Sequence, residues 1–144
     1  MRTRGSILPV VLVALVLLFV AGPLALVGQA NLRALRVGLA ERQAEDLAAY
    51  ALAAAQREGA GQVGRPAARC PEDSGAWRFR SFEVDGRLLG EYAYLRLRSR
   101  RGVSEWCVAG RTAGGPLNHG ERVEVRYRAS VDSSGRLLRW EVLP

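Results

Sequence analysis

The chain has no lysine, one histidine and two cysteines, and its first acidic residue is Glu41. All 21 basic residues are therefore arginines, which remain charged throughout the physiological pH range. The single histidine, His119, lies in a Gly-Pro-Leu-Asn-His-Gly loop, where we expect no acid–base role. Two cysteines and one distant histidine are too few to form a zinc site, and no nucleophile elbow or phosphate-binding loop occurs. We therefore expect a protein without catalytic activity, metal or cofactor.

Charge is also absent from a long stretch near the N-terminus. The 22 residues from Ile7 to Gly28 carry no charged side chain, and as a helix they would span roughly 33 Å, about one bilayer core. The apolar region of a secretory signal peptide is shorter, about 7–15 residues. The pattern predicts a basic leader at 1–5 and a membrane-embedded helix at 6–28. Within that helix, Gly22-Pro23 predicts a kink or a locally unwound turn.

The residues at the start of this run, Arg4-Gly5-Ser6-Ile7-Leu8, resemble the N-terminus of type IV pilins and of type II secretion pseudopilins. The resemblance is greatest to minor pilins, and it implies cleavage by a prepilin peptidase between Gly5 and Ser6, followed by methylation of the new amino terminus. Major pilins usually carry glutamate at the fifth residue after the cut, where this chain has Val10. The difference implies a subunit of a filament tip or initiation complex rather than of the shaft.

Residues 29–58 predict an amphipathic continuation of the helix, ended by glycines at 59 and 61. The apolar stripe that we expect on it consists of Leu32, Leu35, Leu39, Leu47, Tyr50 and Ala54. Alanines at 48, 49, 51, 53, 54 and 55 provide a smooth surface that another element could approach closely. A Gly/Pro-rich linker at 59–71 follows.

Residues 72–144 predict an antiparallel β domain. The side-chain pattern changes to a period of two after Trp77, and Asp85-Gly86 is a strong hairpin signal. Further alternating segments follow around 89–97, 103–109, 123–131 and 138–142. We expect an α+β fold in which the long N-terminal helix packs on one apolar face of a four- to five-stranded meander, the pilin-like layout.

The two cysteines, Cys70 and Cys107, predict a disulfide, because an even pair in a small exported domain is usually bonded. The bond would close a loop of about 37 residues and stabilise the domain by roughly 3–4 kcal/mol.

Arginines alternate with tyrosines on two of the expected strands, which makes a polyanion such as DNA a candidate ligand. The expected binding face consists of Tyr92, Tyr94, Arg96, Arg98, Arg126 and Arg128. The same pattern also fits an ordinary solvated sheet face.

These observations predict a minor pilin-like structural subunit whose partners are other pilin subunits. It would reside in the inner membrane before assembly and afterwards in an extracytoplasmic filament, with its C-terminal domain exported. Arg2 and Arg4 before the apolar run are nearly balanced by Arg33 and Arg36 after it, so the cysteine pair and the β-rich domain decide this orientation. The alternatives are an uncleaved, single-pass anchored binding module, which would contact DNA through the arginine and tyrosine face, and a secreted domain cut near Ala30. The sequence does not distinguish a pilus from a secretion or competence system.

Overall fold

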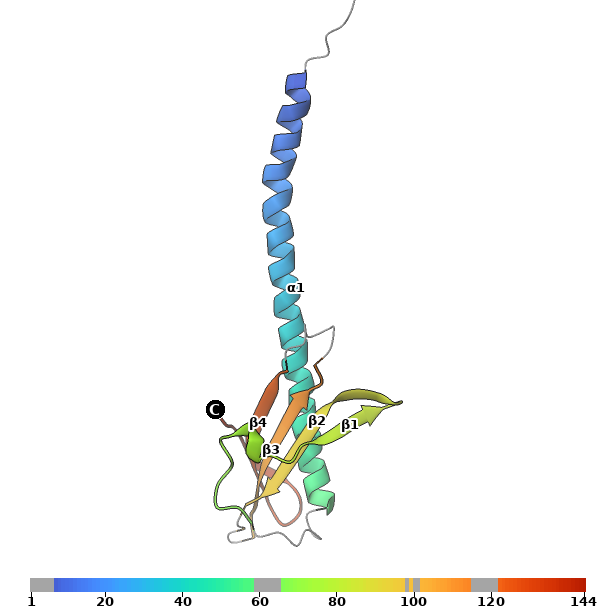
Figure 1. The fold of residues 1–144 in the computed structure, drawn as a ribbon. Helices are drawn as coiled ribbons and strands as arrows, with labels where there is room; N and C mark the ends of the chain where they lie inside the picture. Colours follow the sequence, from blue (N-terminus) through green and yellow to red (C-terminus); the bar gives the residue numbers. More distant parts are fainter. Residues whose placement is uncertain (1–6, 59–65, 98, 100–101, 115–121) are drawn as a thin grey trace, which may run out of the picture. The chain divides into compact units, whose positions relative to one another are not determined.

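The computed structural model describes residues 7–58, 66–97, 99, 102–114 and 122–144. A long N-terminal helix and a five-stranded antiparallel sheet make up the fold, which confirms the expected α+β class (Figure 1). The elements in chain order are α1 (Ile7–Glu58), the 3-10 turn η1 (Ser74–Ala76), β1 (Arg80–Val84), β2 (Arg87–Arg96), β3 (Ser104–Thr112), β4 (Glu124–Val131) and β5 (Leu137–Val142).

The chain divides into two compact units, Met1–Val37 and Gly38–Pro144. In the first unit α1 continues without interruption through Gly22 and Pro23, so the locally unwound turn is not found. Proline removes one backbone N–H donor, but the hydrogen bonds of the turns on either side can still hold the helix.

In the second unit the strands form a meander in the order β1-β2-β3-β4-β5. The first hairpin turns at Asp85-Gly86, where both residues have positive φ, 51° and 73°. This is the conformation required at both centres of a type I′ turn, whose twist matches that of the flanking strands. The hairpin predicted from this dipeptide is confirmed.

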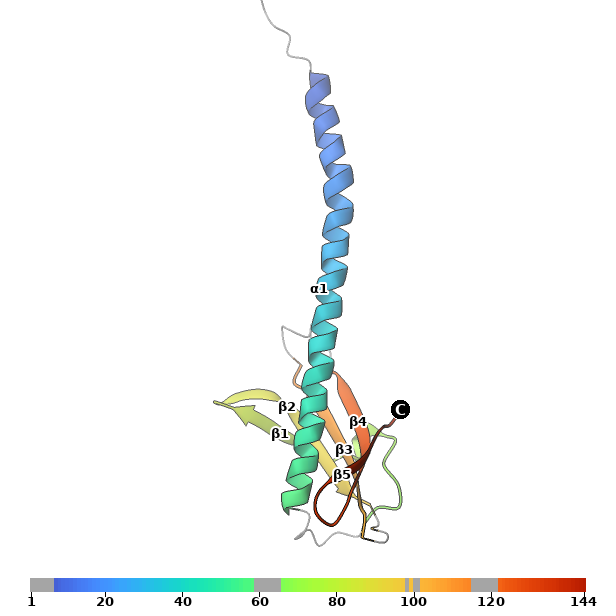
Figure 2. The same ribbon diagram turned by 180° about the vertical axis from the view of Figure 1, so that it is seen from behind.

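The C-terminal part of α1 lies across one face of the sheet (Figures 1 and 2). Its buried residues are mostly alanines, and the cluster formed with the sheet contains Ala48, Ala51, Leu52 and Ala55. The expected leucine stripe is wrong in its first half, because Leu32, Leu35 and Leu39 are exposed. Alanine is favoured on the buried side because the helix backbone comes close to the sheet.

The closest approach occurs at Gly110, near the C-terminal end of β3. A Cβ atom placed there would collide with the backbone carbonyl oxygen of Ala44 and would lie only 2.6 Å from the backbone nitrogen of Ala48. A glycine inside a strand often marks such an approach of another backbone. Gly110 therefore permits the distance at which α1 lies on the sheet.

The opposite face of the sheet is also apolar, so the expectation of a single apolar face is wrong. Residues 66–79, here called the cover segment, lie over this outer face. The second core cluster joins Trp77 of the cover segment to Ala93, Leu97, Cys107 and Ala109 of the sheet. The sheet is therefore the middle layer between α1 and the cover segment.

We predict that Gly110→Ala lowers the free energy of unfolding by about 2–4 kcal/mol, because the atoms it meets are backbone atoms of α1 that cannot rotate away. Gly38→Ala is the control, since a Cβ at that helical position meets nothing within 4 Å. The control should be neutral or stabilise by up to about 1 kcal/mol through helix propensity. Chemical unfolding of the two variants measures the difference, and equal stabilities would contradict the close packing.

Candidate functional site

The first candidate surface is the apolar part of α1. Every large apolar side chain described between Val10 and Leu39 is exposed, with Val10 69% and Phe19 76% accessible. The helix is long and apolar enough to cross a membrane, a property that membrane anchors share with signal sequences. So large an apolar surface requires a cover of lipid or of other apolar helices.

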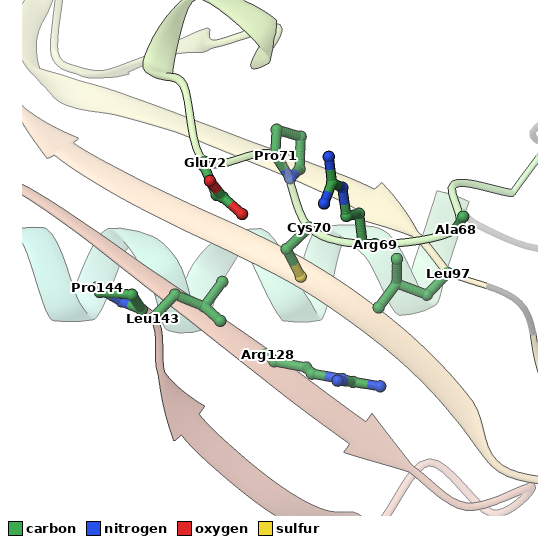
Figure 3. A pocket seen from close by; sticks show the side chains of 9 residues that line it. All are labelled: Ala68, Arg69, Cys70, Pro71, Glu72, Leu97, Arg128, Leu143 and Pro144. Atoms are coloured by element: carbon green, nitrogen blue, oxygen red, sulfur yellow. The ribbon is translucent and has the colours of Figure 1, made fainter.

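The second candidate is the region around the disulfide. Cys70 of the cover segment is bonded to Cys107 of β3, with the two Cα atoms 5.6 Å apart, which confirms the expected pair. A cavity of about 280 Å³ opens beside this bond (Figure 3). It is lined by Ala68, Arg69, Cys70, Pro71, Glu72, Leu97, Arg128, Leu143 and Pro144.

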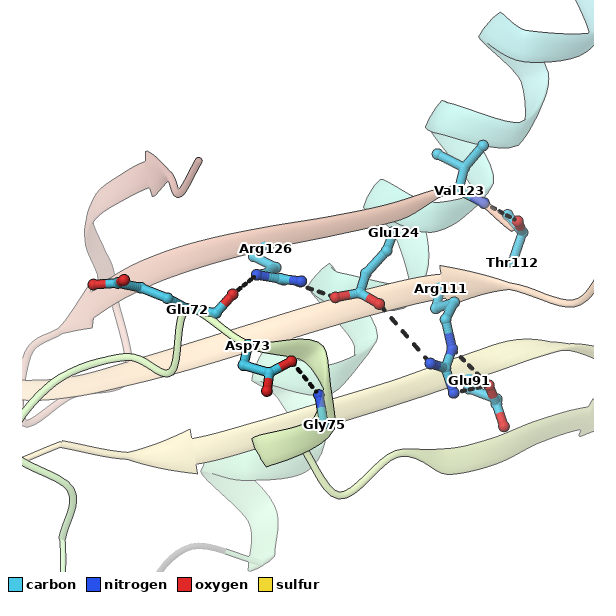
Figure 4. Close-up of polar contacts among 9 residues, drawn as sticks. All are labelled: Glu72, Asp73, Gly75, Glu91, Arg111, Thr112, Val123, Glu124 and Arg126. Atoms are coloured by element: carbon cyan, nitrogen blue, oxygen red, sulfur yellow. Dashed lines mark hydrogen bonds and ion pairs between the residues drawn. The ribbon is translucent and has the colours of Figure 1, made fainter. Parts of the chain in front are cut away.

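A row of alternating charges crosses the outer face at the other end of the cover segment (Figure 4). Arg111 on β3 lies between Glu91 of β2, at 2.5 Å, and Glu124 of β4, at 3.9 Å. Glu124 also accepts a hydrogen bond of 2.7 Å from Arg126, which donates another to the backbone oxygen of Glu72. Because these residues are cross-strand neighbours, the row both neutralises the arginines and fixes the cover segment.

Arg111 has a second role under the cover segment. Its guanidinium carbon lies 3.9 Å from the centre of the Phe79 ring, in cation–π contact. No sequence pattern indicates this pairing, because the two residues are far apart in the chain.

The end of α1 is held by a polar cluster on the helix side of the sheet. Glu58 accepts hydrogen bonds from the hydroxyl of Tyr94 and from the guanidinium of Arg80, the latter at 2.6 Å. The Tyr94 bond, followed by that of Arg80, lowers the pKa of Glu58. Burial, followed by the bond to Glu58, raises the pKa of Tyr94, so its hydroxyl remains a donor to higher pH.

The candidate polyanion face is not assembled. Tyr92 and Tyr94 belong to the cluster that faces α1, and Arg96 lies over the Trp106 ring of that same side. Arg126 and Arg128 are on the outer face, because the strand register places them beside Ala109 and Cys107. The prediction of a shared outward face is therefore wrong. Strand β2 is apolar on both sides, so its alternation did not indicate which side faces outward.

The arginines of this set that the structure describes on the outer face are paired. Arg128 contacts Glu105 at 2.7 Å, and Arg126 contacts Glu124. Of the remaining predicted site residues, Gly5, Ser6 and Arg98 lie outside the described residues, and so does His119, for which no role was expected. Within the described ranges no group of three or more histidine, cysteine or acidic side chains is placed to hold a metal ion.

No family model, no curated protein and no solved structure matches the chain. Its function is therefore inferred from the chain's own residues.

We predict that reduction of the disulfide lowers the melting temperature of the full chain in detergent. The loop it closes, with a sequence separation of 37, corresponds to about 3–4 kcal/mol in the chain-entropy model. The control is the Cys70→Ser/Cys107→Ser variant, whose melting temperature should not respond to reductant. A wild-type melting temperature that is unchanged by complete reduction would contradict this role.

We also predict a pH-dependent loss of stability in Glu58→Gln. Because the pKa of Glu58 is lowered from 4.5 in the folded state, its ionised form stabilises the fold above pH 4.5. That contribution is lost as the pH falls through the folded-state pKa. The variant should therefore be less stable than wild type at about pH 7, and this deficit should be smaller at about pH 3.

Chemical unfolding at the two pH values measures this difference. Glu41→Gln is the matched control, because Glu41 is an exposed glutamate of the same helix that forms no ion pair among the described residues. A deficit of Glu58→Gln that is the same at both pH values would exclude the ionised carboxylate as its cause.

Proposed function

We propose that this protein is a minor pilin-like structural subunit that assembles through its N-terminal helix into a type IV pilus or a related filament. The main observation is that α1 has two parts, one with exposed apolar side chains and one packed on the sheet. Its large apolar side chains from Val10 to Leu39 are exposed, whereas its later turns are packed on a folded sheet, mostly by alanines. Such a helix can anchor the subunit in the inner membrane and can later pack against the helices of other subunits.

The residue at position 10 supports a location at the end of a filament rather than in its shaft. In major pilins a carboxylate at this position attracts the amino terminus of a neighbour, an interaction that is strong at low dielectric. Val10 offers no such charge and is exposed on the helix. The subunit would thus begin or cap a filament, with other minor pilins as its partners and the β domain exported.

The alternative is an anchored export module that is never cleaved or assembled. Both functions need the same apolar helix, and they differ in what happens at Gly5-Ser6 and in where the protein finally resides. DNA binding by the module is not favoured, since its proposed residues lie on opposite faces of the sheet.

We predict that the protein purified from its own membranes begins at N-methylated Ser6, and intact mass with N-terminal sequencing measures this. Gly5→Leu should keep the leader attached, because a prepilin peptidase requires the small residue before the cut. Gly28→Leu is the control, since its position on the helix is open and it should be processed normally.

Three other outcomes would contradict the proposal. A chain that begins at Met1 would indicate a plain membrane anchor, and one that begins near Asn31 a secreted domain. A processed chain that never appears in sheared filament fractions would exclude assembly.

A further inference from the structure

The disulfide is asymmetric in its access to solvent. Cys107 lies in the middle of β3 with no exposed surface, whereas Cys70 is partly exposed and lines the cavity at the edge of the cover segment (Figure 3). The cavity therefore reaches Cys70, whereas Cys107 is enclosed in the sheet.

Two arginines line the cavity beside the disulfide. Arg69 precedes Cys70 in the chain and lines the same cavity. Arg128 is the cross-strand partner of Cys107, so both side chains are on the outer face. A neighbouring cation stabilises a thiolate, which opposes the effect of burial on Cys107. Glu105 takes up part of the charge of Arg128 through their 2.7 Å ion pair.

The cover segment has other attachments on each side of Cys70. Before it, the N–H of Ala67 donates to the oxygen of Arg96 at 2.9 Å. After it, Arg126 holds the oxygen of Glu72, and Trp77 is buried in the outer core. Opening the S–S bond therefore does not require the domain to unfold.

We infer that the Cys70–Cys107 bond is a thiol–disulfide exchange site of the folded protein, at which an external dithiol attacks Sγ of Cys70. The attacking thiolate forms a bond to this sulfur, the S–S bond breaks, and Cys107 leaves as a thiolate beside Arg128. The second thiol of the reagent then attacks the mixed disulfide, which releases Cys70 as a thiolate. The reagent is oxidised to its disulfide, and the two protein thiolates take up the protons that the reagent's thiols have lost.

The product keeps its fold while the cover segment is freed at Cys70. The bond would thus control how firmly this segment lies on the outer face. The inference does not depend on filament assembly, because it concerns only the exported domain.

The first test follows the reduction of the native full chain in detergent by excess dithiothreitol. Aliquots are alkylated and their intact masses are measured, which gives the fraction of reduced protein. Hydrogen exchange of the β3 backbone amides is measured in parallel. If thiol–disulfide exchange occurs in the folded protein, the S–S bond should be reduced at least about tenfold faster than the β3 amides exchange their hydrogens. Opening no faster than these amides would overturn the inference, because reduction would then require unfolding.

Charge variants test the role of Arg128. Arg128→Ala should slow the reduction about threefold, and Glu105→Gln should accelerate it by a similar factor. Arg87→Ala, which removes an exposed arginine at the far hairpin, should have no effect. Equal rates for the Arg128 and Arg87 variants would exclude stabilisation of the leaving thiolate by Arg128.

Single-cysteine variants test which sulfur is attacked. In Cys107→Ser the remaining Cys70 should react rapidly with an aromatic disulfide reagent. In Cys70→Ser the buried Cys107 should react only after denaturation. Equal rates would overturn the assignment of Cys70 as the attacked sulfur.

Discussion

The architecture of the β domain depends on one contact between backbones, that of α1 with β3 at Gly110. Because Gly110 has no Cβ, the helix backbone can lie directly on the strand. This explains why most of the buried residues of α1 are alanines, with only Leu47 and Leu52 as larger buried side chains. The larger side chains of the helix-facing core, such as Trp106 and Tyr127, lie beside the contact and fill the space that the alanines leave.

The outer face follows a different principle. There the sheet is covered by a segment with little secondary structure of its own, which is held by a covalent bond, a row of charges and two aromatic side chains. A segment of this kind gains little from its own backbone hydrogen bonds, so it needs such external attachments to remain ordered. The helix is held by the close fit of its backbone on the sheet, whereas the cover segment is held by covalent, ionic and aromatic contacts. The disulfide differs from the other attachments described here because it is covalent.

Much of this arrangement was predictable from local patterns. The Asp85-Gly86 turn, the five alternating segments, the cysteine pair and the end of α1 near the glycines at 59 and 61 all have signals within a few residues. The side of the sheet that each β2 residue faces was not predictable, because residues on both sides of this strand are apolar or aromatic. The strand register in the structure shows which side each residue faces. Tyr94 pairs with Val108, and Val108 pairs with Tyr127, so all three lie on the same side of the sheet. Gly110 was a local signal that could have been used, because a glycine inside a strand indicates close approach.

The contact at Gly110 also limits how this sequence can change. When two side chains clash in a core, a smaller residue at the second position can restore the fit. Here the atoms that a new side chain would meet are the carbonyl oxygen of Ala44 and the nitrogen of Ala48, which every amino acid carries. No second-site suppressor at either helical position can therefore relieve a substitution of Gly110. A genetic screen for revertants should return only true reversion, or changes elsewhere that move the whole helix.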